Sequence, residues 1–390
     1  PMAEETHRKD KIIPDEILQQ LAELGVFGIS IPEEYGGSFS DHLVMIIATE
    51  ELSRASLGTG GSVLTRPEIC AKALLAGGTE EQKKRWLPVI ASGEKMVCVA
   101  VTEPNTGSDV ANVAMTARKV EDGYLLNGEK TWATFAGRSE IICLLARTGE
   151  TQSGHKGLSL FLVEKPYDRS NNDEFHFRHE QLQGGVIEGR AIPTIGYRGM
   201  HSFSIAFENY LVPKENLIGE EGRGLYLQMQ GFAGGRIQTA ARAIGVMEAA
   251  FRAAIDYSKS RKLFGCYLAD FSLTNYKLAQ MAAKIHASRQ LAYSVASAMD
   301  QGGGSTEASL VKLLACRDSE WVTREAMQLH GGMGYSEEYP ISQYFVDARV
   351  LPISEGAEEV LALQVITRPY LQQFLEDEHR AKQRVNSELL

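Results

Sequence analysis

The chain has 390 residues, of which 44% are hydrophobic and 23% charged, and a formal net charge of −10. This length predicts two or three domains rather than one small core. The acidic balance argues against nucleic acid as the main partner, and no apolar run approaches the roughly 20 residues that span a bilayer.

Five cysteines are scattered through the chain without a Cys-x-x-Cys pair. Neither structural disulfides nor a zinc site is therefore expected, and no metal ligands are assigned. No signal peptide opens the chain, so the cytoplasm of a bacterium or a mitochondrial matrix fits this composition.

Residues 1–96 are predicted to form an α-helical domain. Apolar side chains recur at helical spacing in 14–24 and again in 42–52, and Gly25 is expected to end the first of these helices. The run Thr79-Glu-Glu-Gln82 is a capping-box pattern, which predicts a helix start just before Trp86.

Residues 97–213 change character and are predicted to form a small antiparallel β domain. Apolar runs of strand length occupy 97–101, 141–146 and 158–163. Asp122-Gly123 and Asn127-Gly128 are turn signals that predict breaks between strands within 116–134. The polar, irregular stretch 167–185 is expected to be a surface loop.

Residues 214–390 return to helical patterns and are predicted to form a four-helix bundle. Apolar residues recur at spacings of three and four along 237–255, 278–295 and 311–329. Many Ala and Gly residues lie between them and allow close helix–helix approach. Short linkers favour antiparallel neighbours, so the whole chain is expected to be of the α+β class.

Glu355 is the candidate for acid–base chemistry. It follows an apolar run broken by Pro352, stands directly before Gly356, and is expected to precede a helix over 357–366. A carboxylate among apolar groups holds its proton more strongly and can serve as a general base. Judged from its neighbours alone, Glu355 is equally an ordinary first-turn residue, favoured near a helix N-terminus.

Four further motifs combine turns, glycines and polar side chains. A Gly/Pro-rich turn can direct N–H groups and hydroxyls at a planar polar ligand, and a guanidinium suits a diphosphate. Taken singly, the 101–109 turn would be a plain polar loop, Trp132 a core residue and Arg261 a solvated charge at the end of a helix. No Gly-x-Gly-x-x-Gly follows a strand, so a Rossmann site is not supported. The motifs are Val101-Thr-Glu-Pro-Asn-Thr-Gly-Ser-Asp109, Asn127-Gly-Glu-Lys-Thr-Trp-Ala-Thr134, Arg261-Lys-Leu-Phe-Gly265 and Gln328-Leu-His-Gly-Gly-Met-Gly-Tyr335.

Together with the Glu355 turn, these motifs resemble the acyl-CoA dehydrogenase family over nearly the whole chain. Ser354 and Ala357 depart from the family, where Tyr and Thr are common. The resemblance implies three domains and one FAD per subunit, held without a Rossmann fold in a site shared between subunits of a homo-oligomer. By resemblance, the residues that meet FAD are Val101, Thr102, Gly107, Ser108, Trp132, Thr134, Arg261, Phe264, Gln328, Gly331 and Gly332.

The resemblance also implies a reaction and a partner. Glu355 would remove the α-proton of an acyl-CoA, and electron-transferring flavoprotein would accept the electrons. Some family members carry the base on the helix just before the residue that matches Arg236, but Gly235 stands there in this chain. Family members usually have another helix before Leu24, so we expect this chain to be a piece of a longer or trimmed protein.

Substrate contacts are expected from Ser108, Arg236 and Arg66. Arg66 falls where the family lines the far end of the acyl pocket, and an unpaired buried cation is costly there. A short branched acyl group with its own carboxylate would pair with it; alternatively, Arg66 pairs with Glu68 or another surface acid. A monocarboxylic acyl-CoA substrate, a flavin oxidase or monooxygenase, and a non-enzymatic acyl-CoA or flavin binder remain as alternative functions.

Overall fold

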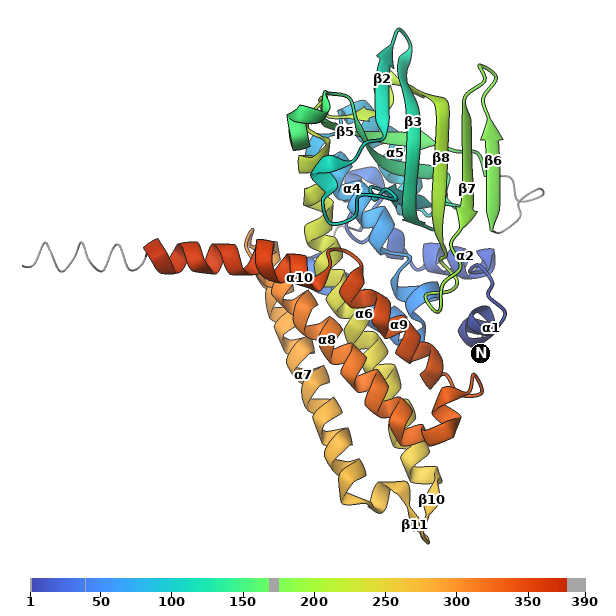
Figure 1. The fold of residues 1–390 in the computed structure, drawn as a ribbon, viewed down its shortest axis with the longest axis vertical. Coiled ribbons are helices and arrows are strands. Elements are labelled where there is room, and N and C mark those ends of the chain that lie inside the picture. The colour runs from blue at the N-terminus through green and yellow to red at the C-terminus, as the bar shows by residue number, and fades with distance from the viewer. Residues whose placement is uncertain (1, 39, 168–174, 377–390) are drawn as a thin grey trace, which may run out of the picture.

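The computed structural model describes residues 2–38, 40–167 and 175–376. A sheet occupies one end of the long axis, a bundle of helices forms the other end, and the first helices lie beside their junction (Figure 1). This is the predicted α+β fold with its helical, β and helical parts. The N-terminal helices are α1 (Met2–Arg8), α2 (Asp15–Glu23), α3 (His42–Ala55), α4 (Thr65–Gly77) and α5 (Glu80–Ala91).

The local signals of the N-terminal helices act as predicted. Gly25 follows Leu24, the C-cap residue of α2, and has a φ of 71°, which is the left-handed conformation that glycine adopts without steric cost. The Thr79 side chain accepts from the Gln82 N–H, and the Gln82 side chain accepts in return from the Thr79 N–H. This capping box starts α5 where the sequence placed it.

The sheet runs in the order β6-β7-β8-β3-β2-β4-β5-β9, and β1 pairs with β4. Most neighbours are antiparallel, but β4 pairs in parallel with both β1 and β2. Most of the side chains of β4 and β5 are fully buried, whereas β2, β6 and β8 alternate buried apolar with exposed polar side chains. The strands are β1 (Val97–Ala100), β2 (Thr116–Val120), β3 (Gly123–Thr134), β4 (Ile141–Arg147), β5 (Leu158–Glu164), β6 (His176–Glu180), β7 (Val186–Ala191), β8 (Ser202–Pro213) and β9 (Leu217–Ile218).

Two predictions in this region are wrong. The strand break expected at Asn127-Gly128 is absent, because β3 continues through it and the register with β8 shifts there. β8 carries the extra residue of this β-bulge, because the two steps from Leu126 to Gly128 on β3 face the three steps from Tyr210 to Phe207 on β8. Asn209, which lies in the bulge, has a φ of 45°. The stretch 167–185 was expected to be a loop throughout, but β6 lies within it and pairs with β7; residues 168–174 lie outside the described part of the chain.

The bundle is formed by four long helices and a short hairpin at its far end. Helix α6 is 37 residues long and packs along α8, α3 and α4. Its Gly245 is required for this approach, since a Cβ there would lie only 2.3 Å from the Glu50 carbonyl oxygen on α3. The elements are α6 (Gly224–Ser260), β10 (Lys262–Leu263), β11 (Cys266–Tyr267), α7 (Ser272–Asp300), α8 (Ser305–His330), α9 (Ile341–Ile353) and α10 (Glu358–Val360).

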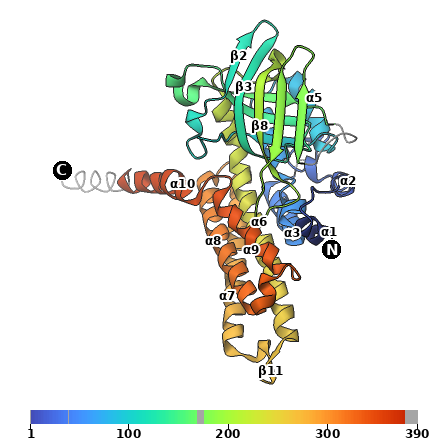
Figure 2. The ribbon, with the colours of Figure 1, turned by 45° about the vertical axis from the view of Figure 1, so that its right-hand side comes forward.

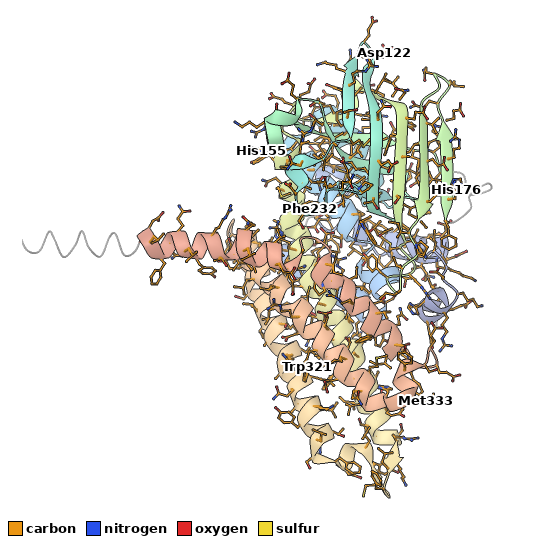
Figure 3. The ribbon with its side chains drawn as sticks, in the orientation of Figure 1. Asp122, His155, His176, Phe232, Trp321 and Met333 are labelled. Atoms are coloured by element: carbon orange, nitrogen blue, oxygen red, sulfur yellow. The ribbon has the colours of Figure 1, made fainter. Side chains whose placement is uncertain are left out.

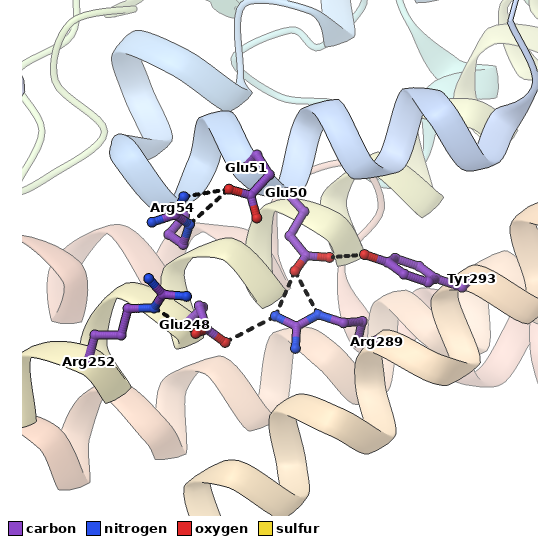
Figure 4. A network of polar contacts seen from close by, with 7 residues as sticks. All are labelled: Glu50, Glu51, Arg54, Glu248, Arg252, Arg289 and Tyr293. Carbon is purple, nitrogen blue, oxygen red and sulfur yellow. Dashed lines mark hydrogen bonds and ion pairs between the residues drawn. The ribbon is translucent and has the colours of Figure 1, made fainter. Parts of the chain in front are cut away.

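A buried polar network joins α3 to the bundle (Figure 4). Arg289 on α7 donates to Glu50 at 2.7 Å and to Glu248 on α6 at 3.1 Å. The Tyr293 hydroxyl donates to the other oxygen of Glu50 at 3.0 Å. Because the buried Glu50 carboxylate is fully paired, α3 can lie against α6 and α7 without an uncompensated charge.

A helical stretch follows the bundle and projects from its side in both views (Figures 1 and 2). It comprises α10, the wider turn Leu361–Ile366 and the helical residues 367–376. None of the helices in the described part of the chain has both the length and the apolarity that crossing a membrane would require. The large apolar side chains exposed on this stretch are Leu363, Tyr370, Leu371, Phe374 and Leu375.

Candidate active site

Glu355 lies in the tight turn between α9 and α10. Its backbone φ is 54° and that of Gly356 is 96°, so two successive residues take the left-handed conformation. The buried Lys312 ammonium on α8 fixes the turn by donating to the carbonyl oxygens of Pro352 (3.0 Å) and Gly356 (2.7 Å). The turn leaves the Glu355 side chain only 11% exposed and aimed toward α6. The helix expected over 357–366 begins at Glu358.

Gly235 makes room for this carboxylate on α6. A Cβ at that position would lie 3.3 Å from Glu355 Oε2, which is tighter than an ordinary van der Waals contact. The next residue, Arg236, donates from Nη1 to Ser309 Oγ at 3.3 Å, and its buried Nε has no partner. Burial lowers the pKa of Arg236, although the nearby Glu355 carboxylate opposes this shift. Glu355 therefore lies against the α6 backbone beside a guanidinium.

Arg66 enters the same space from α4. It is 7% exposed, its Nη1 donates to the Ser62 carbonyl oxygen at 3.3 Å, and its Nη2 lies 4.0 Å from Glu355 Oε1. Burial lowers the pKa of Arg66, but Tyr197 and Glu355 outweigh burial and leave the pKa raised. The alternative pairing of Arg66 with Glu68 does not occur, because the carboxylate beside Arg66 is that of Glu355.

Arg242 is a member of this cluster that the sequence did not single out. It lies on α6, is 1% exposed, and donates from Nη1 to Tyr197 Oη at 3.4 Å. The sequence feature that could have identified Arg242 is its position as the one charged residue in the Ala-rich run 239–245. A charge at the centre of a buried helix needs a counter-charge or a ligand.

Tyr197 reaches the cluster from the loop between β7 and β8. Its φ of 59° is unusual for a bulky residue and is held by a hydrogen bond from its N–H to Asp347 Oδ1 at 2.6 Å. Asp347 is buried on α9, and burial raises its pKa to about 6. Asp347 is thus a positioning residue that fixes Tyr197 over the two arginines.

Glu68 is a second buried carboxyl group near the site. Its Oε2 has no hydrogen-bond partner, and a Cβ added to Gly234 on α6 would lie 2.9 Å from its Oε1. Burial raises the pKa of Glu68 to about 7, and the nearby Lys72 lowers it only in part. The charged form is therefore disfavoured in the folded protein.

We expect Glu68→Gln to flatten the pH dependence of stability. The pKa of Glu68 is higher in the folded than in the unfolded protein. Its contribution to the stability of the wild type is therefore fully present below the unfolded-state pKa and is lost as the pH rises through about 7. Between about pH 5.5 and about pH 8.5, the wild type should lose roughly 2 kcal/mol more than the variant. Urea unfolding of the holoenzyme at both pH values measures this difference. The exposed Glu94→Gln is the control, and parallel pH profiles for wild type and Glu68→Gln would contradict the prediction.

The first group of residues expected at the flavin lies beside β3. The Lys130 ammonium donates to the Val101 carbonyl oxygen at 2.9 Å and to Glu103 at 2.8 Å, and the Thr131 N–H donates to the Thr102 carbonyl oxygen at 2.8 Å. Desolvation by burial lowers the pKa of Lys130 to about 8, although Glu103 opposes it. These contacts bind the turn 101–109 to the strand that carries Trp132 and Thr134.

The side chains of this first group divide into buried and open positions. Trp132 has a φ of 57° and is 55% exposed as a residue, so it is not packed in the core as a lone Trp usually is. Gly107 and Ser108 are exposed at the turn. Thr134 is buried and its hydroxyl is 3.0 Å from that of Ser202.

The second expected group lies toward the end of the bundle that is farther from the sheet (Figure 1). Arg261 is the C-cap residue of α6, directly before β10, and Phe264 lies in the turn of the β10–β11 hairpin, where it is 96% exposed with a φ of 50°. Gln328, Gly331 and Gly332 lie where α8 ends, next to Met333 (Figure 3), whereas the first group is carried by β3 of the sheet and the turn before it (Figure 1). All five residues of this group are exposed. A single chain therefore does not bring the two groups together.

The residues of both groups fit FAD. The first offers an exposed aromatic ring and threonines for a flat polar ring system, and the second offers an exposed guanidinium, an amide and open glycines for a diphosphate. Within the described ranges no cluster of three His, Cys, Asp or Glu side chains suits a metal ion. Fold and site together define a three-domain flavoprotein with a carboxylate among arginines.

Comparison with known proteins agrees with a three-domain flavoprotein and identifies its family. Family models for the N-terminal, middle and C-terminal domains of acyl-CoA dehydrogenase match residues 1–94, 98–210 and 222–369. The chain belongs to the acyl-CoA dehydrogenase family, whose members are FAD-binding flavoproteins.

Three relatives illustrate the range of the family. The chain is 44% identical to (2S)-methylsuccinyl-CoA dehydrogenase of Cereibacter sphaeroides over 95% of its own length but only 66% of that relative's. It is 37% identical to a subunit of the caffeyl-CoA reductase–Etf complex of Acetobacterium woodii, over 89% of this chain and 87% of that one. The structure of butyryl-CoA dehydrogenase from Megasphaera elsdenii superposes with a TM-score of 0.85 at 34% identity, over 95% and 93% of the two chains.

Proposed function

We propose that the protein catalyses the FAD-dependent α,β-dehydrogenation of a short branched acyl-CoA that carries a second carboxylate, (2S)-methylsuccinyl-CoA to mesaconyl-CoA. The observation that carries this proposal is the buried Glu355 carboxylate with the Arg66 guanidinium 4.0 Å away. One group can accept a proton and the other can bind a substrate carboxylate. The relative at 44% identity supports the same substrate.

Glu355 acts as the general base of the proposed reaction. It takes the proton from Cα while the hydrogen on Cβ leaves as hydride, so two C–H bonds break and one carbon–carbon double bond forms. FAD, when bound, supplies the acceptor for that hydride. The backbone N–H of Glu355 is expected to donate to the thioester oxygen, where enolate charge develops. The missing side chain of Gly235 leaves room for the Glu355 carboxylate, and the hydrogen bond from Lys312 to the Gly356 carbonyl oxygen stabilises the turn.

Ser108 and Arg236 are the further substrate contacts in this proposal. Ser108 is exposed on the turn that is bound to β3, so it can meet a ligand that lies against the strand. Arg236 has a buried Nε without a partner beside Glu355. Both positions are open to a polar group of the thioester.

The FAD site is proposed to be shared between two copies of the chain in a homo-oligomer. The first group of residues expected at the flavin lies on β3 and the turn before it, whereas the second lies toward the far end of the bundle and is exposed. The apolar face of the projecting stretch 358–376 offers a further contact for a second copy. In such a shared site, the exposed Arg261 of one copy would contact the diphosphate of the FAD that is bound mainly by the other copy.

We expect Arg261→Ala to lose FAD before it loses structure. Removing the guanidinium leaves the diphosphate charge unpaired, at a cost of roughly 1–3 kcal/mol, which weakens FAD binding by roughly fivefold to 150-fold. Flavin absorbance per subunit after gel filtration measures the loss. The neighbouring exposed Lys262→Ala is the control, and retention of full flavin by Arg261→Ala would count against the shared site.

The electron acceptor is proposed to be electron-transferring flavoprotein, in keeping with the Etf-linked relative. The deciding experiment has two stages. Anaerobic addition of methylsuccinyl-CoA should bleach the flavin absorbance, which a non-enzymatic binder would not show. Reoxidation should then be faster with electron-transferring flavoprotein than in air-saturated buffer, and the reverse order would indicate an oxidase or monooxygenase.

A dehydrogenase of monocarboxylic acyl-CoA is the second candidate function, since a butyryl-CoA dehydrogenase shares the fold. Butyryl-, isobutyryl- and 2-methylbutyryl-CoA test it in the same bleaching assay. Arg66 argues against this candidate, because a plain acyl chain leaves its buried charge without a second partner.

A further inference from the structure

Two buried arginines from different helices point into the same space beside Glu355. Arg66 on α4 donates to the Ser62 carbonyl oxygen at 3.3 Å and Arg242 on α6 to the Ser62 hydroxyl at 3.5 Å, so the two guanidinium groups meet at one residue. Burial lowers the pKa of Arg242, and the charge of Arg66 lowers it further. Tyr197 stands between them, since it accepts from Arg242 and also raises the pKa of Arg66. Like charges held together in a buried place need an anion to balance them.

The contacts of Arg242 inside the protein do not supply this anion. Its Nε has no partner, and its Nη1 contacts to Tyr197 Oη (3.4 Å) and Ser62 Oγ (3.5 Å) are at the outer limit of hydrogen bonding. Only the bond from Nη2 to Thr239 Oγ1 is short, at 2.5 Å. Among the residues that the structure describes, no carboxylate forms an ion pair with Arg242.

The acidic groups nearby are already engaged or directed elsewhere. Glu355 lies 4.0 Å from Arg66 and is needed as the base. Glu68 lies against Gly234. The cation that acts on its carboxyl group is Lys72, which lowers the pKa, and neither arginine does so. Asp347 is occupied by the Tyr197 N–H. The cluster therefore keeps an excess of positive charge in the absence of substrate.

We propose that Arg242 and Arg66 together bind a carboxylate carried on Cβ of the acyl group, which makes the substrate class succinyl-type thioesters. This inference rests on the proposed function and deepens it. A group bound to Arg66 lies close to Glu355, and Glu355 must reach the proton on Cα. The carboxylate must then be one carbon removed from Cα, as in a succinyl skeleton, whereas a glutaryl skeleton carries it one carbon farther away. Arg242 supplies the second set of donors, so that both carboxylate oxygens are paired.

A matched series of thioesters tests the inference on the wild-type holoenzyme. Methylsuccinyl-, 2-methylbutyryl- and 2-methylglutaryl-CoA share the branched Cα and differ only in the distal end. We expect kcat/KM for methylsuccinyl-CoA to exceed each of the other two by at least about tenfold. Equal or better turnover of 2-methylglutaryl-CoA would overturn the succinyl-type assignment.

The role of Arg242 is tested by Arg242→Gln and Arg242→Lys. We expect Arg242→Gln to lower the preference for methylsuccinyl- over 2-methylbutyryl-CoA by at least about tenfold, chiefly through KM, and Arg242→Lys to restore part of it. The exposed Arg252→Gln on the same helix is the control. An equal loss on both thioesters would overturn the assignment and indicate a structural role.

Equilibrium binding separates this inference from the proposed reaction. Titration calorimetry with the enoyl products should show that wild type binds mesaconyl-CoA at least about tenfold more tightly than tiglyl-CoA, which lacks the carboxylate. If no thioester bleaches the flavin, the proposed function fails while this preference still supports the carboxylate site. Equal binding of the two products would overturn the inference, whether or not the variants fold.

Discussion

Glu355→Gln is expected to abolish flavin bleaching by acyl-CoA while leaving substrate binding intact. The amide preserves the shape of the side chain in its place against Gly235, but it cannot accept the α-proton. Loss of a positioned general base lowers turnover by roughly a hundredfold to ten-thousandfold. Anaerobic stopped-flow absorbance measures the reduction, and calorimetric titration with methylsuccinyl-CoA measures binding.

The control for this prediction is Glu359→Gln, an exposed carboxylate four residues along the same segment. It should bleach at the wild-type rate. If Glu355→Gln kept near-normal turnover, another group would have to be the base. The proposed mechanism would then be wrong, although the family assignment would stand.

Arg66→Met is expected to give the second large effect, and the effect depends on the substrate. For methylsuccinyl-CoA we expect the loss of about 2–5 kcal/mol in kcat/KM that follows removal of one partner from a buried charged pair. This corresponds to roughly a thirtyfold to several-thousandfold decrease. 2-Methylbutyryl-CoA has a methyl group where the carboxylate would be, so its kcat/KM should change far less. Steady-state assays on the two thioesters compare them directly.

The exposed Arg324→Met on α8 serves as the matched loss of an arginine far from the substrate. Equal losses on both thioesters, or a wild-type preference for 2-methylbutyryl-CoA, would contradict the dicarboxylic substrate. Either result would favour the monocarboxylic dehydrogenase, because the base and the fold are the same for both.

Local patterns in the sequence were enough to predict most of the fold. Apolar spacing marked the helices and strands, and the capping box at Thr79 and the glycine at position 25 placed helix ends correctly. The break predicted at Asn127-Gly128 was wrong, because a dipeptide typical of hairpin turns can also lie inside a strand, here opposite a bulge in β8. Pairing with β8, more than 70 residues away, decides between them, and local propensity cannot report it.

The candidate site was only partly visible in the sequence. Glu355 and Arg66 could be named because they occur in or beside recognisable motifs. Arg242 and Tyr197 could not, because their importance comes from contacts between α6, α4 and the loop before β8. A lone arginine among alanines showed that a charge would be buried, but its position relative to Arg66 became apparent only from the fold.

The separation of the two flavin-facing groups within one chain has a thermodynamic consequence. Under the proposed sharing, FAD binds only where two copies meet, so cofactor binding and subunit association are linked and each strengthens the other by the same factor. Dilution of the protein should then release FAD, and added FAD should shift the sedimentation equilibrium toward the larger species. The fraction of subunits that hold FAD, and with it the activity per subunit, would thus depend on protein concentration through the exposed hairpin around Phe264.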